Sequence, residues 1–445
     1  MASAAEQLAA NFNMGVFSKA TELKQRIWFT LGALVVYRLG TYIPVPGIDA
    51  SVMNEMMSQH GNGLLGMFDM FSGGALRRMT IFALNLMPYI SASIIIQLMT
   101  AAVPSLEVLK KEGEAGRKKL NQYTRYLTVF IAMFQAYGIS IGLESMHGTM
   151  GPAVIDPGWF FRISSVITLV GGTMFLMWLG EQITSRGIGN GTSLIIMAGI
   201  IANLPSAFFS VLELARTGAL SPLFLLVFFV IAVATIFVVV FVERAQRRIP
   251  VQYPKRQVGN RMFGGDSTHI PLKLNTSGVI PPIFASSILL IPATLTSFAQ
   301  NAPSWVQWIS GQLAHGQPLY MVLYAALILF FSFFYTAVVF NPEETAENLK
   351  KYGGFVPGIR PGAATAKYFD TILTRLTFFG GAYLVVICLL PEILISDYGL
   401  PFYFGGTSIL IVVSVTMDTI TQVQSHLVAH QYEGLIRKSR AKGRR

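Results

Sequence analysis

Apolar residues are gathered in ten long segments, which are separated by polar gaps of very different size. Each segment has 16 to 23 residues, about the length that a helix needs to cross a hydrocarbon core of roughly 30 Å. Lipid cannot satisfy exposed backbone groups, so helices are the expected form of these segments. The predicted spans are Ile27–Tyr42, Ile81–Val103, Tyr126–Leu143, Ile163–Ile183, Ser193–Phe209, Leu223–Val242, Ser277–Phe298, Leu319–Phe340, Leu376–Leu394 and Ile409–His426.

Basic residues alternate with the apolar segments. The chain has 33 Lys and Arg residues, and 28 of them lie in every second gap between the segments or in the two tails. Cytosolic loops retain Lys and Arg because moving these charges across a membrane is unfavourable. The bias therefore predicts a multi-pass protein with both termini in the cytosol. The basic residues left for the spans and the outer side are Arg38, Arg77, Arg78, Arg162 and Arg216.

The composition agrees with a membrane protein. Charged residues make up 12% of the chain and hydrophobic residues 53%, whereas a soluble domain has roughly 25% charged residues. The net charge of +11 is then first a topology signal, and ribosomal RNA is the only nucleic acid it favours. The single cysteine, Cys388, excludes an internal disulfide. The leader Met1–Thr21 has no apolar core followed by a cleavage site, so we expect no removed signal peptide.

Two apolar segments are rich in small and polar residues. Asn85–Gln97 and Gly278–Leu290 mix Ser, Pro and Gln with Ile, which suits helices that face protein or water. Close helix packing is the simpler explanation for any single serine. The two segments lie in the second and seventh spans, five spans apart, so their similarity predicts two halves of opposite topology with a path at their interface. Aligning Pro88 with Pro281 pairs Ile90 with Ile283, Ala92 with Ala285, Ser93 with Ser286 and Ile95 with Ile288.

The segment Gly61–Met79, GNGLLGMFDMFSGGALRRM, precedes the second span. It is apolar enough to avoid water, but too short and too broken by glycine to cross the membrane. One interpretation is a re-entrant half-helix, which is tolerated only where it is buried in protein or lines a cavity. An interfacial amphipathic helix on the outer side is the alternative, and periodicity leaves both open.

Long motifs now identify a family. MFDMFSGGALRRMTIFALNLMPYISASIIIQL, WLGEQITSRGIGNGTSLII, FVERAQRRIPVQYPKRQ, STHIPLKLNTSGVIPPIFASS, NPEETAENLKKYGGFVPGIRPG and PFYFGGTSILIVVSVTMD occur in this order. They closely resemble the bacterial members of the SecY/Sec61-alpha family, and the resemblance spans essentially the whole chain. It implies an all-α polytopic membrane protein of the bacterial cytoplasmic (inner) membrane, with ten transmembrane helices in two inverted five-helix halves around a central pore.

The same resemblance implies a function and partners. The halves would be residues 1–210 and 211–445, and the protein would be the protein-conducting channel of the Sec translocon, without enzymatic activity or cofactor. It would pass unfolded precursor proteins and release hydrophobic segments laterally into lipid. The implied partners are SecE and SecG, the SecA motor ATPase, the ribosome, signal-sequence-bearing precursor proteins, membrane lipids, and YidC and SecDF.

The resemblance also assigns site residues inside the membrane. The plug maps to about Leu64–Gly73, and a lateral gate lies between the second and seventh spans. Bulky apolar side chains can close around a translocating chain of any sequence, because dispersion contact is non-directional. Thr192 stands where the family commonly has an apolar residue, so either the ring has a polar notch or the register is off by one turn. The residues are, for the pore ring, Leu86, Ile90, Thr192, Ile196, Ile283 and Ile411; for the plug, Leu64, Leu65, Met67, Phe68, Met70 and Phe71; and for the gate, Ser91, Ile94, Gln97, Phe284 and Ser287.

Two large cytosolic loops, 243–273 and 341–370, form the other expected site. A positive-inside excess alone explains their charge, but the ordered Gly and Pro residues of FVPGIRPG indicate a shaped loop. In the family these loops dock SecA or the ribosome, and the Arg of IRPG matters most. Asn260 replaces an arginine that is frequent there, which predicts a weaker ribosome contact. The docking residues are Arg247, Arg248, Lys255, Arg256, Arg261 and Arg360.

Other chemistries fit the sequence poorly. GIGNGTS has neither a lysine nor a preceding strand, so it is a loop that opens a helix and not a phosphate-binding loop. His426, His430 and Glu433 have metal-compatible spacing but no further ligand, and we expect no metal. An ion-coupled secondary transporter is the alternative function, but its candidate carboxylates, Glu181 and Asp418, lie near cytosolic span ends rather than at midmembrane.

Overall fold

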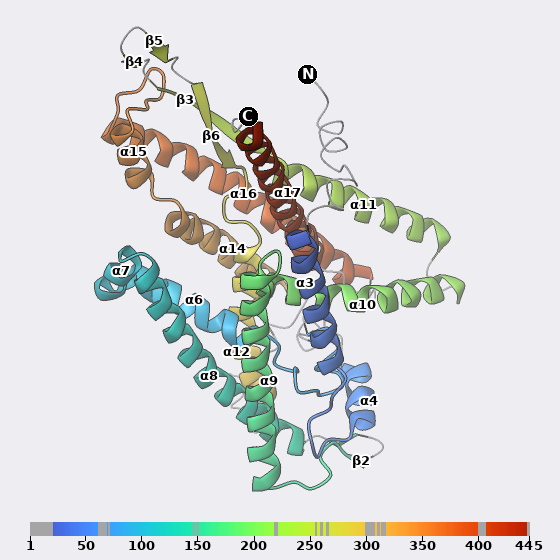
Figure 1. Ribbon diagram of the computed structural model, residues 1–445. Coiled ribbons are helices and arrows are strands. Elements are labelled where there is room, and N and C mark those ends of the chain that lie inside the picture. The colour runs from blue at the N-terminus through green and yellow to red at the C-terminus, as the bar shows by residue number, and fades with distance from the viewer. Residues whose placement is uncertain are drawn as a thin grey trace.

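The computed structural model describes residues 21–60, 69, 72–145, 147–148, 151–217, 221–253, 256–258, 261–263, 267–298, 308, 312, 317–398 and 406–442. The protein is mostly helical, and three small two-stranded sheets occur among these residues. Figure 1 shows the strand pair β3 and β6 at one end of the molecule and β2 at the opposite end. The first elements are α3 (Thr21–Gly40), α4 (Ala50–His60), α6 (Met87–Ala102), α7 (Pro104–Lys111), α8 (Glu114–Ser145), β1 (His147–Gly148), β2 (Gly151–Pro152), α9 (Trp159–Arg186) and α10 (Gly191–Arg216).

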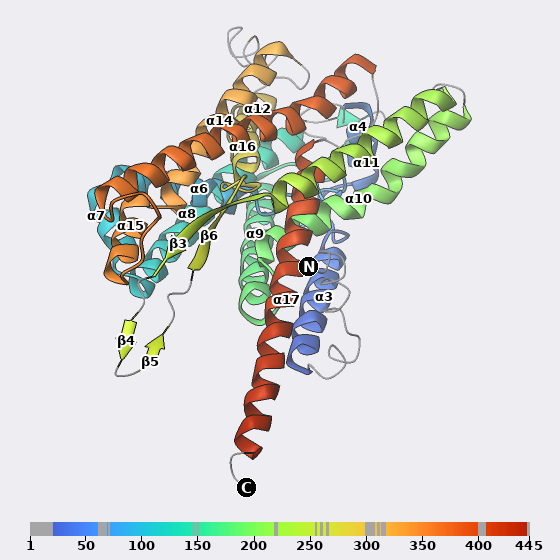
Figure 2. The same cartoon turned by 90° about the horizontal axis from the view of Figure 1, so that it is seen from above.

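The second part of the chain begins with a long apolar helix and a β-hairpin. Figure 2 shows this helix, α11, extending to the same side of the molecule as α10. The elements are α11 (Pro222–Arg244), β3 (Gln246–Gln252), β4 (Arg256–Val258), β5 (Arg261–Phe263), β6 (Ser267–Lys273), α12 (Ile280–Phe298), α14 (Pro318–Val339), α15 (Pro342–Lys351), α16 (Ala363–Tyr398) and α17 (Gly406–Lys442).

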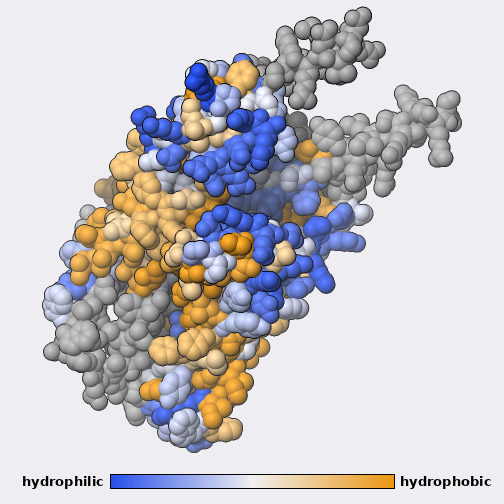
Figure 3. Space-filling model, turned by 90° about the vertical axis from the view of Figure 1, so that its left-hand side faces the viewer, coloured by the Kyte–Doolittle hydropathy of each residue, from blue (hydrophilic) through white to orange (hydrophobic). Residues whose placement is uncertain are grey.

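Several helices have the length and composition of membrane spans. Six described helices pass this test, and a seventh span results if the bent pair α6 and α7 is counted as one. The remaining predicted segments overlap α3, α11 and α12. Most described side chains of α11 are exposed or partly exposed, and Phe237 is 71% exposed, whereas Val239 is buried. Apolar residues also cover much of the face in Figure 3, while hydrophilic residues gather towards its upper end. The protein is therefore a multi-pass helical membrane protein.

The second predicted span begins later than the sequence indicated. Residues 81–86 form successive tight turns, and α6 starts only at Met87. Asn85 has a φ of +48°, outside the helical region, and Pro88 occupies the first turn of the helix, where its missing N–H costs nothing. At its other end α6 is followed by α7, and the two helices meet at a bend of 100°.

The main hydrophobic core lies between helices from both parts of the chain. It joins residues of α3, α6, α9 and α10 to residues of α12 and α17. A second core lies between α11, α12, α14, α16 and α17. Because α12 and α17 contribute to both cores, packing is continuous from one part of the chain to the other.

The described residues of the two loops predicted to be cytosolic, 243–273 and 341–370, form one folded unit, which we name the cytosolic unit after that prediction. Strands β3 and β6 pair antiparallel from Gln246 opposite Lys273 to Gln252 opposite Ser267. The backbone groups of Gln252 and Phe355 exchange two hydrogen bonds of 2.9 Å, which join the hairpin to the segment before α16. A third apolar core, with members on β3, β6, α15 and α16, lies beneath them. The loops are therefore parts of one surface.

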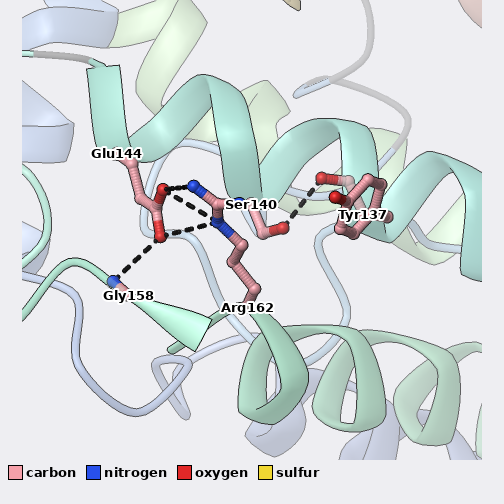
Figure 4. A network of polar contacts seen from close by, with 5 residues as sticks. All are labelled: Tyr137, Ser140, Glu144, Gly158 and Arg162. Atoms are coloured by element: carbon pink, nitrogen blue, oxygen red, sulfur yellow. Dashed lines mark hydrogen bonds and ion pairs between the residues drawn. The ribbon is translucent and has the colours of Figure 1, made fainter. Parts of the chain in front are cut away.

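An ion pair closes the connection between α8 and α9 (Figure 4). Two nitrogens of the Arg162 guanidinium donate to Glu144 at distances from 2.6 to 3.1 Å, and the Gly158 backbone N–H donates to the same carboxylate at 3.1 Å. The pair is only partly exposed to solvent. Arg162 is one of the basic residues that lie outside the loops predicted to be cytosolic. This ion pair explains why an arginine is found there.

Candidate functional site

A group of large apolar side chains from four helices meets in the main core. Leu86 precedes α6 and Ile90 lies on it, while Ile196 belongs to α10 and Ile411 to α17. All four are members of one cluster of buried residues, and Ile283 of α12 is partly buried against it. Five of the six residues predicted for the ring are therefore buried in one apolar core or packed against it, and their arrangement around a pore stays a prediction.

The sixth residue, Thr192, is polar and partly buried, and its contacts are with α9 and the start of its own helix. It occupies the first turn of α10, where its hydroxyl donates to Asn190 Oδ1 at 2.7 Å. Its backbone N–H donates to the same oxygen at 3.2 Å, which makes Asn190 the N-cap of α10. A Cβ added at Gly180 of α9 would lie 3.2 Å from the Thr192 methyl group. Its side chain therefore faces α9 in this conformation, and its role in the ring stays a prediction.

Helices α6 and α12 lie against each other and carry the predicted gate residues. Ser91, Ile94, Phe284 and Ser287 are buried, and Gln97 is partly exposed. The Ser287 hydroxyl donates to the sulfur of Met87, a residue that the sequence analysis did not single out. Met87 could have been found, because it lies within the motif that carries Ile90.

The predicted gate also has an aromatic contact behind it. The rings of Phe284 on α12 and Phe331 on α14 meet edge to face, with centroids 5.7 Å apart. On α6, the Gln97 amide donates to Ser93 of the same helix at 3.3 Å. The first contact joins α12 to α14 and the second lies within α6, so neither links α6 to α12.

The predicted plug residues lie outside the described residues. This holds for Leu64, Leu65, Met67, Phe68, Met70 and Phe71. Asp69 is described, and its carboxylate accepts a hydrogen bond of 2.7 Å from the Arg77 backbone N–H. Burial raises the pKa of the Asp69 carboxyl above its usual range, although this bond acts in the opposite direction. The chain is then well packed from Ser72 onward, where five consecutive residues are buried.

The predicted docking arginines gather on the cytosolic unit. Arg247 and Arg248 are exposed on β3, and Arg360 is exposed in the segment that precedes α16. The hydroxyl of Thr365 donates to the Arg360 carbonyl at 2.8 Å, which fixes the backbone at this position. Arg256 and Arg261 lie on the paired strands β4 and β5, and Lys255 lies outside the described residues. A hollow of about 710 Å³ between α15 and the start of α16 adjoins this surface.

Comparison with known proteins identifies the family. The sequence profile of the SecY family matches residues 80–420, most of the chain. The chain is 59% identical to the protein translocase subunit SecY of Rickettsia conorii over 428 residues, which is 96% of this chain and 99% of that protein. It is 57% identical to the subunit of the same name from Escherichia coli K12 over 95% of this chain and 96% of that one. The chain belongs to the SecY family.

Solved structures share its fold. A structure described as that of a protein conducting channel superposes with a TM-score of 0.66 at 17% sequence identity, covering 92% of this chain and 93% of the other. Sec61 from a canine ribosome–channel complex gives a TM-score of 0.63 at 16% identity, with the same coverage. At this level of identity the likeness describes the fold alone.

Proposed function

We propose that this chain is the channel-forming subunit of a Sec translocon in the bacterial cytoplasmic membrane. In this role it passes unfolded precursor proteins across the membrane and releases hydrophobic segments into lipid. The observation that carries the proposal is the buried apolar cluster that contains Leu86, Ile90, Ile196 and Ile411, with Ile283 against it. These side chains come from four helices of both parts of the chain, so they can form a constriction. A narrow apolar constriction disfavours water and ions while it accepts a chain of any sequence.

The finer architecture follows from the family. Ten helices span the membrane, in halves 1–210 and 211–445 of opposite topology, and both termini lie in the cytosol. The segment Leu64–Gly73 is the plug that rests against the constriction on its outer side. Helices α6 and α12 form the lateral gate, because they come from different halves and meet beside the apolar cluster. The chain itself carries out no chemical reaction in this scheme.

The gate energetics suit a hydrophobic signal sequence as its ligand. Each Leu-like residue that leaves for lipid contributes roughly −0.3 to −0.6 kcal/mol, so an apolar core of about ten residues contributes some −3 to −6 kcal/mol. Reversing a closed-to-open ratio of 99:1 requires about 5.5 kcal/mol. A hydrophobic segment therefore supplies most of the free energy of opening, whereas a polar segment supplies almost none.

The cytosolic unit is the docking surface for the partners that drive transport. Arg247, Arg248 and Arg360 are exposed on it, and guanidinium groups bind phosphate and carboxylate with two parallel hydrogen bonds. One surface can thus bind the acidic groups of SecA and the phosphates of ribosomal RNA in turn. SecE and SecG complete the membrane complex, and YidC and SecDF are its further partners.

An ion-coupled transporter has less support. Its candidate carboxylates are engaged in ion pairs, because Glu181 lies 2.6 Å from the guanidinium of Arg125 and Asp418 lies 3.7 Å from Lys273. A binding assay separates the two functions. Purified protein in nanodiscs is titrated with SecA and with non-translating ribosomes, and the channel account predicts saturable binding of both. If the protein binds neither SecA nor ribosomes, the proposed function is contradicted.

A further inference from the structure

The end of α3 holds the last two residues of the segment proposed as the plug. Arg38, in the last turn of α3, donates to the Gly73 carbonyl at 2.7 Å. Its neighbour Tyr37 is fully buried, and its hydroxyl donates to the Ser72 carbonyl at 3.3 Å. Two consecutive side chains of α3 thus bind two consecutive carbonyl groups. We call the residues from Ser72 to Arg78 the root segment.

A second contact joins Arg78, at the other end of the root segment, to Tyr42, close to the end of α3. The guanidinium carbon of Arg78 lies 4.2 Å from the centre of the Tyr42 ring. That of Arg38 lies 5.1 Å from the same ring, and Arg38 also donates to the Tyr42 hydroxyl at 3.1 Å. Cation–π contacts of this kind stabilise the positions of both partners. Tyr42 therefore links the two arginines, and with them the two ends of the root segment.

The root segment has little freedom to move towards the neighbouring helix. Gly73 has a φ of +69°, and a Cβ added there would lie only 3.0 Å from the Gly199 Cα of α10. Within the turn, Ser72 Oγ donates to the Asp69 carbonyl at 3.0 Å and the Gly74 N–H donates to the same group at 2.9 Å. The root segment is thus fixed on one side by α3 and bounded on the other by α10.

We propose that Arg38 is a positioning residue for the seal of the channel. It fixes the root segment to α3, and this attachment holds the C-terminal end of the proposed plug. This inference rests on the proposed function. It also accounts for two basic residues, Arg38 and Arg78, that the positive-inside distribution leaves unexplained. Their guanidinium groups stabilise the position of the root segment, and this contact explains their presence outside the loops predicted to be cytosolic.

If Arg38 holds the root segment in place, removing its guanidinium should make exposure of that segment more frequent. Hydrogen bonds made by charged groups contribute enough that losing one shifts a two-state equilibrium by roughly tenfold or more. Replacing Arg38 by Gln therefore frees the root segment more often. Replacing it by Lys retains the charge and one donor, and preserves part of the attachment.

The test measures exposure of the root segment directly. Ser72, which is buried, is replaced by Cys in a Cys388→Ser background, and the rate of labelling by a membrane-impermeant thiol reagent is measured from the outer side. Labelling is expected to be about tenfold faster with Arg38→Gln, with an intermediate rate for Arg38→Lys. Arg77→Gln is the matched control, because Arg77 is an exposed neighbour of Arg78. It should leave the rate unchanged.

Two results overturn the inference: equal labelling in Arg38→Gln and the parent, or equal acceleration by Arg77→Gln. If Arg38→Gln does not accumulate, Tyr42→Leu removes the ring that both guanidinium groups cover, and the same acceleration is expected. Tyr42 is 54% exposed, so this change spares the core. An unchanged rate in Tyr42→Leu then rejects the inference. Labelling involves no transport, so failure of the proposed function is recognised separately, by loss of precursor export in the parent protein.

Discussion

The Ser287 hydroxyl of α12 lies 3.8 Å from the Met87 sulfur of α6, across a sequence separation of 200 residues. The same hydroxyl donates to the Ile283 carbonyl of its own helix at 2.7 Å. Sulfur is a weak acceptor, so the bond between the helices contributes little to holding them together. When α6 and α12 separate, Ser287 keeps its partner within α12. The contact is therefore suited to a gate that must open at low cost.

The first prediction concerns orientation. With Cys388 replaced by Ser, single cysteines at Lys255 and Arg360 should react with an impermeant thiol reagent only from the cytosol, and one at Gly148 only from outside. The reason is that Lys and Arg are concentrated in the loops assigned to the cytosol. Labelling of the cysteine at 255 from outside in intact cells would show that the topology is inverted.

The second prediction concerns the docking surface. Arg360→Glu should leave the protein inserted and abundant, because Arg360 is exposed, while charge reversal abolishes export that depends on SecA. The measurement is the export rate of a SecA-dependent precursor in cells that carry only the variant. Lys119→Glu, at an exposed position of α8, is the control and should export normally. Normal export in Arg360→Glu would remove Arg360 from the docking surface.

The third prediction concerns the apolar cluster. Ile411 is 1% exposed, and Ile411→Asn places an amide among apolar side chains, which favours water there and weakens the closed state. Precursors with defective signal sequences should then be exported more readily, and the ion conductance of the purified complex should rise. Val322→Asn, at a position of α14 that is 66% exposed, should do neither. If both quantities stay at the parent level while Ile411→Asn is abundant, Ile411 does not line the pore.

The fourth prediction concerns the pair that closes the α8–α9 connection. Glu144→Gln removes the carboxylate charge from a partly exposed bidentate pair, and should lower the free energy of unfolding by about 1 kcal/mol. Loss of thermal resistance of the purified protein is the measurement. Glu22→Gln removes an exposed pair with Arg26 on α3 and should have almost no effect. An equal loss in both variants would show that the Glu144–Arg162 contact is no stronger than a surface pair.

The sequence was sufficient for features that depend on local pattern. The resemblance to the family, carried by the motifs that contain Leu86, Ile90 and Ile411, assigned these residues to one ring. All three belong to the main hydrophobic core, and the ring itself stays a prediction. The length of the apolar segments predicted ten helices, and each of these segments overlaps a described helix. The late start of α6 is visible in hindsight, because a proline in the first turn, Pro88, is a helix-start signal. Asn190 is likewise a local signal, because asparagine is a favoured N-cap residue. It predicts that α10 begins directly after it and that Thr192 lies in the first turn of the helix.

Features that depend on long-range contact could not be predicted in this way. Nothing in either cytosolic loop indicates that Gln252 pairs with Phe355, because a backbone bridge carries no sequence signature. The contacts of Arg38 with the chain at Gly73 were equally hidden, since charge counting treats an arginine only as a topology signal. Such residues become interpretable only when the fold places their partners.

The measurement that tests the central claim most directly is transport through a channel whose gate is locked. Met87 and Ser287 are replaced by Cys in a Cys388→Ser background, and the purified complex is reconstituted in vesicles with SecA and a precursor. A short bifunctional thiol crosslinker should join α6 to α12 and arrest import of the precursor, whereas either single-cysteine variant should keep transporting after the same treatment. Undiminished import by the fully crosslinked double variant would contradict the account that α6 and α12 form the gate of a protein-conducting channel.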